Sequence, residues 1–235
     1  MMPRFTDEST PILVEACCDS LHTARAAQAH GAGRIELCGP GDGGTTPSLG
    51  LMSRCRDELQ LPIHVMIRCH THSFVYADDE LDIMYNDVVA AKALGIDGVV
   101  VGPLYSDGTV QRHQLAELIA AARPMRVVFH RAFDRTSDRE SAIDTLVALG
   151  IDAVLTSGGA PTALEGAETL ETLHRRFGDR ITILGGGGVR GHTVRELLAR
   201  TKLREIHARG TDPMIIRDVV QALTSLQESA PLQTS

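Results

Sequence analysis

The sequence predicts an α/β protein in which eight parallel strands alternate with eight helices. One phrase recurs three times, as AHGAGRIEL at 29–37, ALGIDGVVV at 93–101 and ALGIDAVLT at 148–156. Each copy is typical of a helix that ends at a glycine and is followed, two or three residues later, by a β-branched strand. The glycines are 64 and 55 positions apart. That distance is about twice the ~30 residues of one strand–helix unit, so the phrase marks alternate units of a longer array.

The intervening units supply the other strands. Apolar runs predict strands at 12–17 (ILVEAC), 34–38 (RIELC), 62–68 (PIHVMIR), 97–102 (DGVVVG), 125–130 (MRVVFH), 152–156 (DAVLT), 180–184 (RITIL) and 203–207 (LREIH). Between them lie segments with apolar residues at helical spacing. In LDIMYNDVVAAKAL at 81–94, for example, Leu81, Met84 and Val88 fall on one face of a helix.

Eight strand–helix units in 235 residues are the count of a compact (β/α)8 barrel, the TIM barrel. A doubly wound open sheet is the alternative, but it usually has fewer units or an antiparallel edge strand. No stretch rich in proline, serine or charge divides the chain. We therefore expect a single TIM-barrel domain over residues 1–235, with 1–10 and 228–235 as frayed tails.

Composition excludes several classes of function. The chain is 43% apolar and 23% charged, has a net charge of −7 and contains no tryptophan. Without a basic excess or aromatic platforms, nucleic acid is not an expected partner. No apolar stretch is long enough for a membrane span, and MMPRFTDESTP lacks the apolar core of a signal peptide. We expect a cytoplasmic protein whose five cysteines are reduced thiols.

Polar side chains near the ends of the first two strands are the first candidates for a site, because TIM-barrel sites form at the carboxyl ends of the strands. Side chains alternate along a strand, so Glu15 and Cys17 share one direction, as do Glu36 and Cys38. Their immediate neighbours are apolar and suit the face that packs against the helices. Two carboxylates and two thiols are therefore predicted to point into the barrel.

Arg68 and His130 end two further strands and complete a polar set with Glu15 and Glu36. In one hypothesis these four are catalytic: one glutamate is the general base, His130 is the acid and Arg68 holds substrate charge. An unpaired buried carboxylate is costly, so the alternative is a network of buried ion pairs that holds the strands in register. In that alternative, Glu36 would be the partner of Arg68.

Four consecutive glycines follow the seventh strand, a place where TIM barrels often bind phosphate through backbone N–H groups. Gly186 and Gly187 are the candidate binding residues, and Arg209 after the last strand would add positive charge. The alternative is a turn that needs positive φ, for which one or two glycines suffice.

Cys17 and Cys38 also suggest a metal site. They would end adjacent parallel strands about 4.8 Å apart and face the same interior. Two converging thiolates suit a soft ion such as Cu(I), although small free cysteines also fill cores for packing alone. Cys18 has the opposite direction and Cys55 lies within a helix, so both are interpreted as packing residues.

Several motifs in fixed order resemble one known family. They are EACCDS at 15–20, RIELC at 34–38, GGTTPSLG at 43–50, VMIR at 65–68, SFVYADDE at 73–80, FHRAFD at 129–134, LTSGGAPTALEG at 155–166, GGGGV at 185–189 and EIH at 205–207. Together they are similar to the copper homeostasis CutC family, over about residues 12 to 210. The resemblance implies a cytoplasmic TIM barrel, usually a homodimer, that acts in copper tolerance or trafficking. It also implies that Cys17 and Cys38 are the Cu(I) ligands.

An enzyme that acts on a small anionic or phosphorylated molecule is the alternative function. One loop also departs from the family pattern, since Cys69-His70-Thr71-His72-Ser73 stands where the family has Pro-Arg-Gly-Gly-Asp. His70 would clamp an anion more weakly than arginine, and only when protonated. Cys69, His70 and His72 could instead add metal ligands, or the loop could simply tolerate change.

Overall fold

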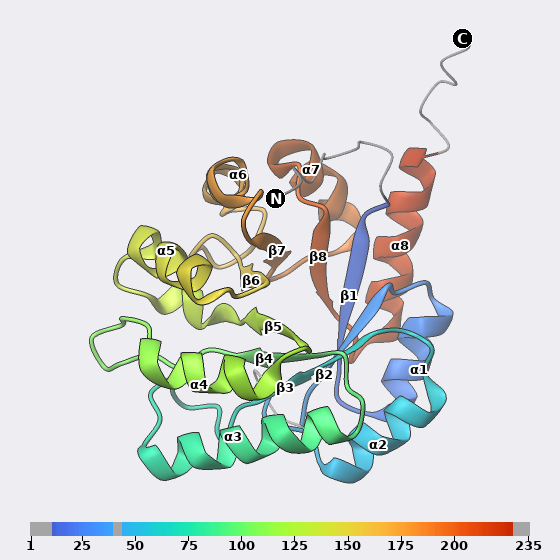
Figure 1. The fold of residues 1–235 in the computed structure, drawn as a ribbon. Helices are drawn as coiled ribbons and strands as arrows, with labels where there is room; N and C mark the ends of the chain where they lie inside the picture. The colour runs from blue at the N-terminus through green and yellow to red at the C-terminus, as the bar shows by residue number, and fades with distance from the viewer. Residues whose placement is uncertain (1–10, 40–43, 228–235) are drawn as a thin grey trace.

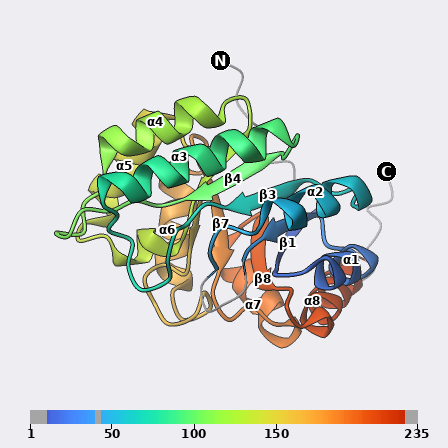
Figure 2. The same ribbon diagram turned by 90° about the horizontal axis from the view of Figure 1, so that it is seen from below.

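The computed structural model describes residues 11–39 and 44–227, and it confirms the predicted (β/α)8 barrel. Eight parallel strands follow one another in chain order and close into a barrel, because β1 pairs with both β2 and β8. The helices surround the strands, and α1 and α8 lie side by side where the chain's first and last units meet (Figures 1 and 2). The tails predicted at 1–10 and 228–235 lie outside the described residues.

The strands are short and each is followed by its helix. The strands are β1 (Leu13–Cys18), β2 (Arg34–Leu37), β3 (Ile63–Met66), β4 (Gly98–Val101), β5 (Arg126–Phe129), β6 (Ala153–Thr156), β7 (Thr182–Gly186) and β8 (Glu205–Arg209). The helices are α1 (Leu21–Ala29), α2 (Leu49–Glu58), α3 (Asp78–Ala93), α4 (Arg112–Ala122), α5 (Arg139–Leu149), α6 (Ala167–Phe177), α7 (Gly191–Thr201) and α8 (Pro213–Gln227), and a 3-10 helix, η1 (Arg131–Arg135), follows β5. No helix in these described parts of the chain is long and apolar enough to cross a bilayer.

The glycines of the recurring phrase end helices, as the sequence predicts. Gly150 is the cap of α5 and has a φ of 77°. Gly31 and Gly95 follow the last residues of α1 and α3 and have φ values of 88° and 71°. This left-handed backbone suits glycine because it has no Cβ to clash. The repeat is therefore a repeat of helix endings.

Two apolar cores lie on the two sides of the strands. The outer core lies between strands and helices and includes Val14 and Ala16 of β1. The inner core fills the barrel and consists of Cys38, Met66, Val100, Val128, Ala153, Leu155 and Leu184, with Cys17 packed against it. The predicted alternation along β1 is thus confirmed, because Cys17 is on the inner side and its neighbour Ala16 on the outer side.

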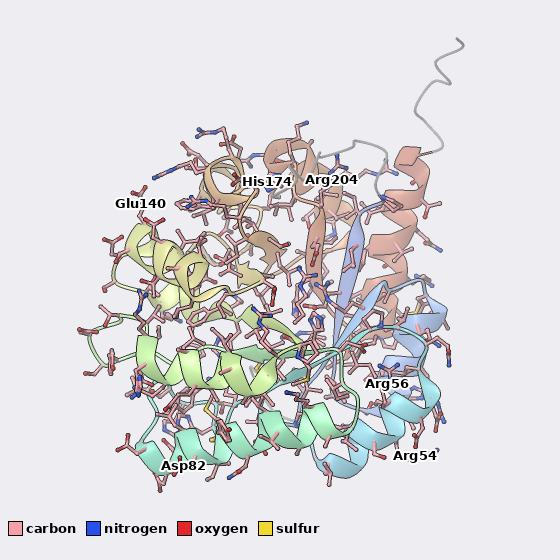
Figure 3. The ribbon with its side chains drawn as sticks, viewed as in Figure 1. Arg54, Arg56, Asp82, Glu140, His174 and Arg204 are labelled. Carbon is pink, nitrogen blue, oxygen red and sulfur yellow. The ribbon has the colours of Figure 1, made fainter. Side chains whose placement is uncertain are left out.

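Ion pairs close the amino-terminal end of the barrel. Glu205, the first residue of β8, accepts hydrogen bonds from Arg34 Nη2 at 2.6 Å and from Arg126 Nη2 at 3.1 Å. Each arginine is the first residue of its own strand. By contrast, charged side chains on the helices, such as Arg54 and Glu140, point away from the barrel (Figure 3). Polar groups inside the barrel are therefore the ones that need a specific explanation.

Candidate functional site

Glu15 is the centre of a polar cluster inside the barrel. It is only 1% exposed. Its Oε2 accepts a hydrogen bond from Arg34 Nε at 2.5 Å and lies 3.5 Å from His64 Nδ1. Its Oε1 lies 2.8 Å from His207 Nδ1. Burial alone would raise the pKa of Glu15, but Arg34 and the hydrogen bond to His207 outweigh it and hold that pKa well below its usual range. Glu15 is therefore an anion with fixed partners.

The second carboxylate, Glu36, has the opposite character. Burial and the negative charge of Cys17 raise its pKa well above the ordinary value, although the nearby His207 opposes them. Glu36 Oε2 lies 3.8 Å from His207 Nε2 and accepts a hydrogen bond from Cys38 Sγ at 3.5 Å. Its Oε1 is buried and has no hydrogen-bond partner in the described parts of the chain. Glu36 is thus suited to carry a proton beside a thiol.

Cys17 and Cys38 lie next to this carboxylate, and their Sγ atoms are 3.6 Å apart. Their shared hydrogen bond lowers the pKa of Cys17 and raises that of Cys38. A hydrogen bond to His207 further favours the Cys17 thiolate. The two sulfurs therefore share a hydrogen bond, and of the two thiols Cys17 is the one that loses its proton more readily.

Gly44 brings the following loop close to the thiols. Its φ is +73°, and a Cβ at this position would lie 2.8 Å from Cys38 Sγ. A side chain at this φ would be strained and would press on the sulfur, so glycine at position 44 permits this close approach to Cys38.

His207 and Arg34 are essential to the cluster but are absent from the residues predicted as catalytic. His207 lies between Glu15 and Glu36, whose charges raise its pKa well above normal although burial opposes them. A sequence signal exists for Arg34, which shares the inward direction of Glu36. His207 lies opposite Glu15 through the register of β1 and β8, which only the closed barrel determines.

Arg68 and His130, the other two predicted catalytic residues, follow β3 and β5, and both contact the ring of Phe74. The Arg68 guanidinium is 4.6 Å from the centre of the Phe74 ring, and the His130 ring is 5.0 Å from it. Arg68 Nη2 donates hydrogen bonds to the backbone carbonyls of Thr71 at 2.8 Å and Ser73 at 3.3 Å. The sequence suggested Arg68 as the partner of Glu36, but the basic side chain near Glu36 is His207. Arg68 instead holds the loop after β3.

His130 is neutral at ordinary pH. Burial and the positive charge of Arg68 lower its pKa to about 3. The general-acid role suggested for this residue requires a proton that it does not hold at neutral pH. It can donate a hydrogen bond but does not supply charge.

The residues predicted to form an anion site, Gly186, Gly187 and Arg209, do not lie together in the structure. Gly187 has a φ of +111°, and a Cβ there would lie 3.1 Å from Ser157 Cβ and 3.4 Å from Arg131 Nη1. Arg209 is exposed and pairs in register with Cys17, so it lies at the thiol side of the mouth. The arginine beside the glycine turn is therefore Arg131.

Gly186 faces the barrel interior, where a Cβ would overlap Leu155 and lie 3.1 Å from His207 Cβ. This glycine makes room for neighbouring side chains.

A carboxylate of the protein already occupies the donors near Gly187. Asp134 Oδ2 accepts hydrogen bonds from Arg131 Nε at 2.8 Å and Ser157 Oγ at 3.0 Å, and its Oδ1 accepts one from Gly159 N at 3.1 Å. A bound phosphate would have to compete with this internal anion. The turn-forming interpretation of the glycines is the one that these contacts favour.

The divergent loop after β3 does not gather its metal-ligating side chains. His70 and His72 stack with ring centres 3.7 Å apart, and His70 Nε2 lies 3.3 Å from Glu80 Oε1. Cys69 Sγ donates to the backbone carbonyl of Glu80, and burial raises the pKa of its thiol to about 11. Two groups of converging ligands occur in the described residues, and both lie in the barrel: Cys17, Glu36 and Cys38, and Glu15, Glu36 and His207.

Cys18 and Cys55 are fully buried in the outer core, where burial raises the pKa of both thiols, that of Cys55 to about 11. Their contacts agree with the packing role predicted for them.

Comparison with known proteins gives one consistent result. The sequence matches the CutC family over residues 12–211. It is 41% identical to the mouse copper homeostasis protein cutC homolog, over 83% of this chain and 72% of that protein. It is 43% identical to a family protein CutC of Xanthomonas campestris, over 86% of this chain and 84% of that protein. The solved structure of a putative copper homeostasis protein CutC from Streptococcus agalactiae superposes with a TM-score of 0.79 at 34% identity, over 83% of this chain and 97% of that one.

Proposed function

Because the chain belongs to the CutC family of copper homeostasis proteins, we propose that it binds Cu(I) between Cys17 and Cys38 at the mouth of the barrel. The observation that carries the proposal is the 3.6 Å separation of the two Sγ atoms. Metal–thiolate bonds of about 2.3 Å, the length found for zinc, allow an ion to bridge sulfurs up to roughly 4.6 Å apart. The two sulfurs are thus near enough to share one ion without movement of the strands.

The chemistry of the two sulfurs also suits Cu(I). Thiolates are soft ligands, and soft ligands select Cu(I) over harder cations. The pKa of Cys17 is lowered and that of Cys38 is raised, so Cys38 is the thiol that gives up its proton less readily when a metal binds. Cys38 Sγ also lies 3.5 Å from Glu36 Oε2, the carboxylate whose pKa is raised. Copper binding therefore releases a thiol proton.

Charge around the thiols is arranged to hold this centre. A Cu(I) ion with two thiolates has a net charge of −1, and a buried anion needs a nearby cation. His207 supplies one, because its pKa is raised and it contacts both Glu15 and Glu36. Arg34 in turn balances Glu15 at 2.5 Å.

Competition for Cu(I) against a chelator of known affinity tests this proposal. We expect Cys17→Ser and Cys38→Ser each to weaken binding at least about tenfold, a loss of about 1.4 kcal/mol, because two-coordinate binding needs both sulfurs. Cys55→Ser is the matched control and should bind like the parent protein, because Cys55 lies in the outer core. Equal affinity in all three variants would show that the thiols only pack.

An enzyme that performs acid–base chemistry on a small anionic molecule is a second candidate, and one observation favours it. Glu15 and Glu36 both contact His207, yet their pKa values shift in opposite directions. Two nearby carboxylates with separated pKa values are the usual arrangement of an acid and a base in one site. Thermal unfolding of the Glu36→Gln variant tests this candidate.

A further inference from the structure

The carboxylate of Glu36 lies beside the two thiols inside the barrel. Glu36 is 2% exposed, and its Oε2 lies 3.5 Å from Cys38 Sγ. One of its oxygens and the sulfurs of Cys17 and Cys38 all lie within 4.8 Å of one another. The other oxygen, Oε1, is buried and has no hydrogen-bond partner among the residues that the structure describes. A buried polar atom without a partner is unusual, so this oxygen needs an explanation.

The distances among the three side chains fit a tetrahedral ion. With Zn–S bonds of about 2.3 Å and a Zn–O bond of about 2.1 Å, a tetrahedral site places two sulfurs about 3.8 Å apart and a sulfur and an oxygen about 3.6 Å apart. The two Sγ atoms are 3.6 Å apart, and Cys38 Sγ and Glu36 Oε2 are 3.5 Å apart. Two sulfurs on opposite sides of an ion would instead lie about 4.6 Å apart. The spacing in the barrel is therefore closer to a tetrahedral site than to a linear one.

The charge of the three ligands favours a divalent ion. A metal binds thiolates and carboxylates in their deprotonated forms, so Cys17, Cys38 and Glu36 together bring three negative charges. A monovalent ion leaves two of these charges uncompensated, and a divalent ion leaves one. Because uncompensated charge is costly in a buried place, the third anionic ligand suits a divalent ion better than Cu(I).

We infer that Cys17, Glu36 and Cys38 form a three-ligand site for a divalent ion that accepts sulfur and oxygen ligands, for which Zn(II) is the best fit. Glu36 is then the residue that distinguishes Zn(II) from Cu(I), because the two sulfurs alone suffice for Cu(I). Three protein ligands leave the fourth tetrahedral position to solvent. The inference rests on the proposed function only in treating the two thiols as metal ligands, and it does not require that copper binds.

The second group of converging ligands, Glu15, Glu36 and His207, is a less suitable site. Glu15 is already held by Arg34 at 2.5 Å and by His207 at 2.8 Å, so an ion would have to displace these partners. Cys17, by contrast, is only partly buried, so an ion can reach the two sulfurs.

Competition for Zn(II) between the metal-free protein and a chromophoric chelator tests the inference. We expect Glu36→Gln to weaken Zn(II) binding at least about tenfold, because the amide has no charge. The same variant should keep its Cu(I) affinity within about threefold of the parent. Glu36→Asp retains the carboxylate on a shorter side chain and should bind Zn(II) more tightly than Glu36→Gln. Glu140→Gln, which changes an exposed glutamate on α5, is the matched control and should bind both metals like the parent.

Co(II) serves as a spectroscopic probe of the same site. Its absorption spectrum in the parent protein should show tetrahedral coordination with sulfur-to-metal charge transfer, and Cys17→Ser and Cys38→Ser should each reduce the charge-transfer band. Metal-free melting curves establish that each variant is folded before metal is added. The inference is overturned if the parent does not bind Zn(II), or if Glu36→Gln binds Zn(II) like the parent. It is also overturned if Glu36→Gln weakens Cu(I) and Zn(II) binding equally. The Cu(I) affinity of the parent is measured separately, so these failures differ from a failure of the copper proposal.

Discussion

Glu15 and His207 are 192 positions apart in the chain, yet Glu15 Oε1 and His207 Nδ1 lie 2.8 Å apart inside the barrel. The contact exists because β1 and β8 pair in register, with Glu15 opposite His207. The same carboxylate also binds Arg34 of β2. One side chain thus joins three consecutive strands at the point where the barrel closes.

Glu15→Gln should therefore destabilise the protein strongly. The change leaves the buried Arg34 without its nearest anion, and breaking a buried pair costs about 3–5 kcal/mol. Arg34 keeps its ion pair with Glu205, so the loss should be at the low end of that range. We expect the free energy of unfolding to fall by about 3 kcal/mol and the Tm by roughly 6–12 °C for a chain of this size. Glu140→Gln removes the carboxylate of an exposed pair with Arg176 and should cost less than about 1 kcal/mol. Similar Tm values for the two variants would contradict the role given to Glu15.

The pH dependence of stability gives a second test of Glu15. Its pKa is depressed on folding, so its contribution is complete above the ordinary value of 4.5 and is lost as the pH falls further. The Tm difference between the parent and Glu15→Gln should be constant from pH 6 to 7 and shrink below pH 4.5. Melting curves across this range measure it. A difference that stays constant to low pH would show that Glu15 is not ionised in the folded protein.

Much of the fold follows from local sequence signals. The glycines at the helix ends and the alternation along β1 depend only on neighbours in the chain. With the eight apolar runs they predict eight units, and alternation along the first two strands places Cys17 and Cys38 on the inner side. The partner of each charge depends on how the strands are staggered. Glu15 lies opposite His207 because the register between β1 and β8 is set by closure of the whole barrel.

The difference between local signals and long-range geometry also explains why the pairing of Glu36 with Arg68, suggested from the sequence, is wrong. Arg68 is inward-facing at the end of its strand, which makes it a reasonable partner for Glu36 from the sequence alone. In the structure the Arg68 guanidinium donates to backbone carbonyls of the loop after β3. The arginine that does bind a buried glutamate is Arg34, and that glutamate is Glu15. Arg131 replaces Arg209 beside Gly187 for a similar reason, because η1 places it there. Loop conformation is the part that local patterns did not determine.

Cu(I) should stabilise the folded protein by an amount that depends on its free concentration relative to its Kd. A ligand at a free concentration of 100 times its Kd adds about 2.7 kcal/mol to the free energy of unfolding. We expect the Tm of the parent protein to rise with buffered Cu(I) and to return when a chelator removes the metal. Cys38→Ser should show little of this increase because it lacks one of the two sulfurs. An equal increase in this variant would place the copper elsewhere.

Gly44→Ala tests whether the loop over Cys38 matters for binding. Any side chain at this φ of +73° costs about 1–2 kcal/mol, and here the Cβ would also press on Cys38 Sγ. Gly95 offers a matched control, because its φ is +71° but a Cβ there meets nothing within 4 Å. Both variants should lose similar backbone stability. Only Gly44→Ala should also lower Cu(I) affinity in the chelator competition.

If Gly95→Ala weakened copper binding as much, the effect would come from general destabilisation. If Gly44→Ala left the affinity unchanged, the loop would have no part in positioning Cys38.

The enzyme candidate depends on whether Glu36 serves an acid–base site or only the fold. If it carries a proton in the folded protein, Glu36→Gln replaces one neutral group with another of similar size. Its pKa is raised on folding, so the parent protein binds more protons folded than unfolded between the ordinary value of 4.5 and the raised one. Stability of the parent therefore falls as pH rises through that window, and the glutamine variant lacks this loss. We expect Glu36→Gln to match or exceed the parent in Tm at pH 7, as substitutions at functional sites often do.

An ionised Glu36 that serves only the fold predicts the reverse. It would be the partner of the His207 cation, whose Nε2 lies 3.8 Å away, and its removal would cost about 3–5 kcal/mol. Thermal unfolding of the parent and Glu36→Gln proteins at pH 6 and pH 8, with metal chelated, separates the two cases. A variant that melts several degrees lower at both pH values assigns Glu36 to the framework and removes the basis for an acid–base enzyme. A variant that is equal at pH 6 and more stable at pH 8 identifies a proton-carrying carboxylate, held at a cost in stability beside the thiols.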